Sequence, residues 1–111
     1  MADLDVGDLA SQVAGAMIGQ LAAYGSDAES YAKAEAQKIA ISIAHIGELL
    51  ASGAIDEYEA KLKFDIQRNA TRTMLTTVEG IGIIAAEQAI NAGLNAIKGL
   101  VNGALKFALL P

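Results

Sequence analysis

Apolar residues recur along most of this sequence at spacings of three and four positions, which place them on one face of an α-helix. The pattern runs through four stretches, at about 4–24, 27–52, 56–79 and 83–109, each long enough for roughly 33 Å of helix. No stretch alternates apolar and polar residues as a half-buried strand does. The only proline is Pro111, at the last position. The sequence therefore predicts an all-α fold, in a single domain over residues 1–111.

The strongest interruption of the helical pattern lies at residues 52–56. Gly53 suits the left-handed residue that follows the end of a helix. Asp56 suits the position before the next helix, and Glu59, three residues later, completes a capping box. These residues predict the main turn of an antiparallel helical hairpin.

Each arm of this hairpin contains a second, weaker interruption. In the first arm, Gly25 can end a helix, and Ser26 with Glu29 repeats the capping-box pattern. In the second arm, Gly80 and Gly82 together cost a helix roughly 1.5–2 kcal/mol relative to alanine. The fold is therefore expected to consist of long, glycine-interrupted helices in four segments.

Two architectures satisfy this pattern. The arms can bend at the glycines and close as a four-helix bundle, or run on as helices of about 45 residues in a hairpin roughly 70 Å long. The extended hairpin exposes an apolar side and must pair with copies of itself in a helical oligomer. The wide apolar stripes favour the extended form, and the glycine hinges would allow interconversion by domain swapping. Antiparallel pairing also sets Glu48 near Lys61 and Glu35 near Arg72.

Apolar faces define the expected packing surfaces. Segment 27–52 carries a heptad seam suited to knobs-into-holes packing, and segment 83–109 carries a broad apolar face beside a narrow polar stripe. In segment 56–79 the apolar series begins with Tyr58, Leu62 and Ile66 at four-residue steps. The residues predicted for the helix-packing or oligomer interface are Ile39, Ile43, Ile46, Leu50, Leu94, Ile97, Val101 and Leu105.

Small and amide side chains refine this expectation. Glycine pairs one helical turn apart, at 15 and 19 and at 99 and 103, would allow close helix–helix contact. Three asparagines, Asn91, Asn95 and Asn102, lie in the polar stripe of segment 83–109. Such a stripe could form a hydrogen-bonded ladder that sets the register between identical helices.

Charge is unevenly distributed. The net charge is −5, and residues 1–59 hold ten acids against two bases, while residues 60–111 hold three acids against six bases. Two such halves attract when they pack antiparallel. Lys61, Asp65, Arg68 and Arg72 form a basic stripe, interpreted as a solvated face or one that pairs with the acidic half, with an anion-binding stripe as the alternative. The acidic balance predicts no nucleic-acid partner.

No set of residues indicates catalysis. There is no cysteine, and His45 is the only histidine. His45 and Glu48 lie one turn apart, but carboxylate di-metal bundles use the reverse order, Glu-x-x-His, on two helices together with two further glutamates. This sequence contains no such motif and no second histidine. We therefore predict no metal, no cofactor and no enzyme. If His45 lies in an oligomer interface, its titration near neutral pH would make assembly pH-sensitive.

The sequence thus predicts a non-enzymatic structural or interaction protein that self-associates through helical hairpin packing. Its expected partner is a second copy, with a helical protein as a further candidate. The alternative is a membrane-active or translocated helical protein, of secreted or phage type, that uses the apolar C-terminal helix; the absence of tryptophan and the few bases disfavour it. The acidic N-terminus does not resemble a signal peptide, and no conventional transmembrane helix is expected, which leaves the cytoplasm as the default compartment.

Overall fold

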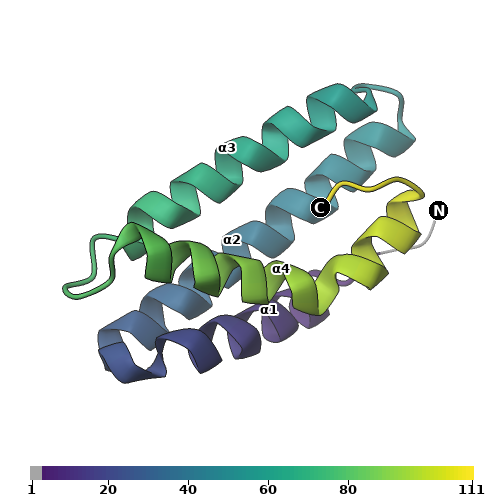
Figure 1. Ribbon diagram of the computed structural model, residues 1–111. Helices are drawn as coiled ribbons and strands as arrows, with labels where there is room; N and C mark the ends of the chain where they lie inside the picture. Colours follow the sequence, from purple (N-terminus) through teal and green to yellow (C-terminus); the bar gives the residue numbers. More distant parts are fainter. Residues whose placement is uncertain (1–3) are drawn as a thin grey trace.

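The computed structural model describes residues 4–111, which form an all-α structure (Figure 1). Residues 1–3 of the predicted domain lie outside the described part. The helices are α1 (Val6–Leu21), α2 (Ser26–Ala51), α3 (Glu57–Leu75) and α4 (Ile83–Leu105), and a 3₁₀ turn (Ala22–Tyr24) joins α1 to α2. Residues 4–111 contain no strand. The prediction of an all-α fold is confirmed.

Consecutive helices run antiparallel and pack as a four-helix bundle (Figure 1). α1 packs extensively against both α2 and α4, whereas α3 packs mainly on α2 and meets α4 only sparsely. Among the described residues, α1 and α3 make no contact. α3 is therefore the peripheral helix of the bundle.

The closed bundle replaces the extended hairpin that the apolar stripes favoured. The described chain measures 42 × 22 × 19 Å, far short of a hairpin of about 70 Å. In the first arm the break lies at Gly25, whose φ of 97° helical residues do not adopt. In the second arm α3 already ends at Leu75, short of the predicted 79, and Gly80, with a φ of 93°, lies in the loop that follows. Two details of the breaks also differ from the prediction. α2 begins at Ser26 after Gly25 with no side-chain cap, and α4 ends at Leu105 instead of reaching 109.

The main turn has the predicted geometry. Gly53 has a φ of 77°. The backbone N–H of Glu59 donates to Asp56 Oδ1 at 2.8 Å, and the backbone N–H of Asp56 donates to Glu59 Oε1 at 3.1 Å. This capping box begins α3 and satisfies two of the backbone N–H groups at the junction.

The close approach of α1 and α4 depends on a glycine that the spacing motifs did not identify. A Cβ on Gly93 would lie 2.9 Å from Val13 Cγ1 and 3.0 Å from Met17 Cγ. The predicted close contacts at the glycine pairs are wrong for the described chain, because a Cβ added at any of these four positions would meet only open space: Gly15, Gly19, Gly99 and Gly103.

Candidate functional site

The predicted interface residues lie on packing faces, but the described chain uses them within itself. Those of α2 and α4 are buried in the core, apart from Leu50 and Leu105, which are half-buried against it. The buried residues of this set are therefore not exposed to a second molecule. The buried members of the set are Ile39, Ile43, Ile46, Leu94, Ile97 and Val101.

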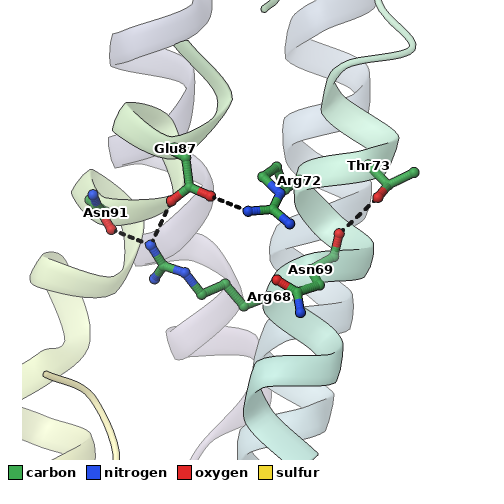
Figure 2. A network of polar contacts seen from close by, with 6 residues as sticks. All are labelled: Arg68, Asn69, Arg72, Thr73, Glu87 and Asn91. Carbon is green, nitrogen blue, oxygen red and sulfur yellow. Dashed lines mark hydrogen bonds and ion pairs between the residues drawn. The ribbon is translucent and has the colours of Figure 1, made fainter. Parts of the chain in front are cut away.

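Where α3 meets α4, a polar network joins the two helices (Figure 2). Arg68 Nη2 donates to Glu87 Oε2 at 2.9 Å and to Asn91 Oδ1 at 2.7 Å. Arg72 Nη1 donates to Glu87 Oε1 at 3.1 Å. Because Glu87 receives one guanidinium on each carboxylate oxygen, it ties two turns of α3 to one turn of α4.

The surroundings of Glu87 favour its charged form. Partial burial by itself would raise the pKa of this carboxyl, but hydrogen bonds from Arg68 and Arg72 and their positive charges act in the opposite direction. The net effect is a pKa below the ordinary value of 4.5. Glu87 is therefore an ionised structural link between helices.

This network corrects the expected pairing of charges. Arg72 binds Glu87 of α4 instead of Glu35, and the described residues show no ion pair between Glu48 and Lys61. The basic stripe of α3 does face an acid, but one in its own half of the sequence. Two of its four residues are thus engaged inside the chain.

Glu35 occupies an unusual position for a carboxylate. Its side chain is 1% exposed, and Oε2 accepts a hydrogen bond from Lys38 Nζ at 2.9 Å. Its other oxygen, Oε1, is buried with no hydrogen-bond partner. The ammonium group of Lys38, one helical turn away and largely exposed, is the only countercharge bonded to it among the described residues.

After α4 the chain reverses into a segment that we call the C-terminal strap, residues 106–111. Figure 1 shows its end lying between α3 and α4. Leu109 and Leu110 are 3% and 1% exposed, so the strap completes the core. A cavity of about 300 Å³ remains beside it, lined from α3 by Lys61, Phe64, Asp65 and Arg68, from α4 by Asn91, and from the strap by Ala108, Leu109 and Pro111.

The amide of Asn102 holds this strap. Its Nδ2 donates to the carbonyl oxygen of Leu110 at 2.8 Å, and its Oδ1 accepts from the backbone N–H of Leu110 at 3.0 Å. Two of the three asparagines of the predicted stripe therefore bind within the chain, Asn102 to the strap and Asn91 to Arg68, whereas Asn95 is exposed. Sequence reasoning missed the strap because its apolar residues continue the helical pattern of α4.

The largest exposed apolar series lies on α3. Tyr58, Leu62 and Ile66 are 70%, 46% and 70% exposed; we call these three residues the outer stripe. The rest of the described chain leaves these three side chains uncovered. α3 instead buries its opposite side, which consists of Ala60, Phe64, Thr71 and Leu75.

A shallow groove adjoins the outer stripe between α2 and α3. It measures about 260 Å³ and is lined by Ser42, His45, Ile46, Lys63, Ile66 and Gln67. His45 is exposed in this groove. Across residues 4–111, no group of three or more histidine, aspartate or glutamate side chains is placed to hold a metal ion.

The helices of the bundle are too short or too polar to cross a membrane. Although α4 is rich in apolar residues, none of the helices in the described part of the chain combines the length and hydropathy that a membrane span needs. Comparison with protein-family models, with curated proteins and with solved structures gives no match.

Proposed function

We propose that this chain is a non-enzymatic interaction protein that self-associates, and that the outer stripe of α3 is the surface through which it does so. The observation that carries the proposal is the exposure of Tyr58, Leu62 and Ile66 on a single helix face. Burying a large apolar side chain contributes roughly 1.5–3 kcal/mol. A second molecule that covers this stripe gains much of that stabilisation.

The order of charges along α3 favours a second copy in antiparallel orientation. The first turn carries Glu57 and Glu59, and the next turn carries Lys61 and Lys63. When two α3 helices pack antiparallel about the midpoint of Tyr58 and Leu62, the acidic turn of each faces the basic turn of the other. A parallel pair would place like charges together. Antiparallel packing also gives the two-fold symmetry of most homodimers.

The first test is the absolute mass in solution, measured by light scattering after size exclusion over a range of concentrations. The monomer has a mass of 11.4 kDa, and we expect a concentration-dependent rise to a dimer. Tyr58→Glu should abolish the rise, because Tyr58 of each chain packs against Leu62 of the other in this arrangement and the variant places a charge in that apolar contact. The matched control is Ser11→Glu, which adds the same charge on an exposed site of α1, a helix that does not touch α3.

A mass of 11.4 kDa at every concentration would reject self-association. A dimer that persists with Tyr58→Glu but is lost with a change elsewhere would support self-association through a different surface. Both results are informative because Tyr58 is 70% exposed, so its replacement should leave the fold of the monomer intact.

A second candidate function rests on a different exposed site. Ile83 and Ile84, in the first turn of α4, are 65% and 75% exposed. Together they could insert into the interfacial region of a bilayer, which would make the protein membrane-active without a membrane span. Flotation with liposomes, compared between the natural chain and Ile83→Ser/Ile84→Ser, tests this alternative. Binding that depends on the two isoleucines would support it.

A further inference from the structure

The C-terminal strap is bound in the way that one molecule binds a peptide of another. Two apolar side chains, Leu109 and Leu110, enter the core, and the backbone of Leu110 makes two hydrogen bonds with the side chain of Asn102. Pairing of a backbone N–H and C=O with a single amide resembles one step of a β-ladder, which peptide-binding grooves also use. The strap is therefore held both by two buried apolar side chains and by two hydrogen bonds.

Its binding site exists because α3 and α4 diverge. The polar network of Arg68, Arg72 and Glu87 holds these helices together at one level, and elsewhere they meet sparsely. The strap fills part of the resulting cleft and leaves the cavity of about 300 Å³ next to Phe64. Without the strap, this part of the core would be open to solvent.

A single residue joins the strap to α4. Lys106 has a φ of 61° and is the only residue other than glycine with a positive φ among those described. A left-handed conformation is unfavourable for a lysine. If Lys106 became helical, α4 would extend and carry the strap away from its own cleft.

We propose that the cleft between α3 and α4 binds the C-terminal strap of a second copy of this chain, in a reciprocal exchange that opens Lys106 in both molecules. The exchange keeps the burial of Leu109 and Leu110 and both hydrogen bonds of Asn102, now between chains. It also removes the left-handed conformation at each hinge. The proposal rests on the proposed self-association and adds to it a contact separate from the outer stripe.

Concentration decides which form is populated. Within one chain the strap binds at an effective concentration of about millimolar, as a short flexible linker gives. The closed monomer therefore dominates in dilute solution, and exchange increases when the protein is concentrated or when neighbouring copies are held together. Dimerisation through the outer stripe would supply such a neighbour.

Engineered cysteines can distinguish the two forms, because the natural chain has no cysteine. Lys61 and Ala108 line the same cavity and are both exposed, so Lys61→Cys and Ala108→Cys should leave the fold intact. In the double variant a short bis-maleimide should link the two cysteines within one chain. The absence of this link would show that the strap does not lie in the cleft and would overturn the proposal.

The decisive measurement mixes the two single variants at about millimolar concentration, where exchange competes with closure. We expect a covalent dimer that contains one chain of each variant, seen by mass spectrometry. The same mixture in a Tyr58→Glu background should still form it, because the exchange does not use the outer stripe. If no mixed dimer forms while the natural chain still dimerises, the exchange is wrong and the proposed self-association stands.

A hinge variant provides the matched control. Lys106→Gly allows the positive φ without strain and should favour the closed monomer roughly fivefold or more per chain, which lowers the yield of mixed dimer. The within-chain link of the double variant should persist in this background. A yield that does not respond to Lys106→Gly would mean that the mixed dimer forms by another contact, and would overturn the exchange.

Discussion

The side chain of Asn102 binds the backbone of Leu110, eight residues later, through both of its polar atoms. This contact explains why α4 ends at Leu105, although the apolar pattern continues beyond it. The strap returns to the bundle because burying Leu109 and Leu110 and satisfying Asn102 together outweigh one more turn of helix. A polar residue at the border of α4 thus determines where the last apolar residues of the chain are buried.

Removing this amide should loosen the strap. Asn102→Ala deletes two hydrogen bonds to a buried backbone, and we expect a loss of about 1–3 kcal/mol in the free energy of unfolding. Hydrogen exchange should become faster at the amide of Leu110 than in the natural chain. Asn95→Ala is the control, because Asn95 is exposed in the same helix, and its effect should stay within about 0.5 kcal/mol. Equal losses in the two variants would contradict the role of Asn102.

The fold was predictable where a local pattern of residues is compatible with only one structure. The capping box of Asp56 and Glu59 and the left-handed Gly53 need only neighbouring residues, and the structure contains both features. The choice between a closed bundle and an extended hairpin depended on whether each arm bends or breaks, and α3 breaks at Leu75, before either glycine of the second arm. A sequence pattern indicates how much a glycine destabilises a helix, but it does not indicate which φ angle that glycine adopts.

The packing surfaces were harder to predict because α3 has two apolar sides. Its longer side chains, Tyr58, Leu62 and Ile66, form the more obvious series, yet the chain buries the side with Ala60 and Phe64. The small side chain of Ala60 allows close packing, and hydrophobicity alone does not measure that fit. In the same way, Gly93 is the glycine that close packing requires, although it belongs to neither of the spaced pairs.

Gly93 gives a second prediction. Gly93→Ala places a methyl group 2.9 Å from Val13 Cγ1 and 3.0 Å from Met17 Cγ, and overpacking of this kind typically costs about 1–3 kcal/mol. The higher helix propensity of alanine offsets part of that cost. The matched control is Gly15→Ala in α1, where nothing lies within 4 Å, and where we expect a gain of about 0.5–1 kcal/mol. Thermal unfolding of both variants measures the difference, and a gain in both would contradict the close contact.

The lowered pKa of Glu87 gives a prediction about pH. Because the folded-state pKa is below the ordinary value of 4.5, the contribution of this group is fully present above that value. It is lost as the pH falls through the folded pKa, since protonation removes the charge that Arg68 and Arg72 bind. At pH 7 we expect the free energy of unfolding of the natural chain to be about 0.5–1 kcal/mol higher than that of Glu87→Gln. The difference is small because the ion pairs are partly exposed to solvent. This difference in unfolding free energy should shrink toward zero as the pH falls below 4.5.

Urea titrations of the natural chain and Glu87→Gln at a series of pH values measure this difference. Other carboxyl groups titrate in the same range, so the informative quantity is the difference between the two chains and not the stability of either. Glu79→Gln is a suitable control, because Glu79 is exposed in the loop between α3 and α4. A constant difference from pH 7 to pH 3 would show that the Glu87 carboxylate is not stabilised by the two arginines.

The last prediction concerns Glu35, whose buried carboxylate is bonded to a single countercharge among the described residues, the ammonium group of Lys38. Lys38→Ala removes the hydrogen bond to Oε2 and leaves the carboxylate without it, for which we expect a loss of about 1–3 kcal/mol in the free energy of unfolding. Glu35→Leu removes the charge and the unpartnered Oε1 together, and should be neutral or stabilising, as is often found when buried charges give way to apolar side chains. In the Glu35→Leu background, Lys38→Ala should then have almost no effect, since Lys38 is 55% exposed and has no acid left to bind. Chemical denaturation of the four chains forms a double-mutant cycle. Additive effects would mean that Lys38 does not stabilise the buried carboxylate.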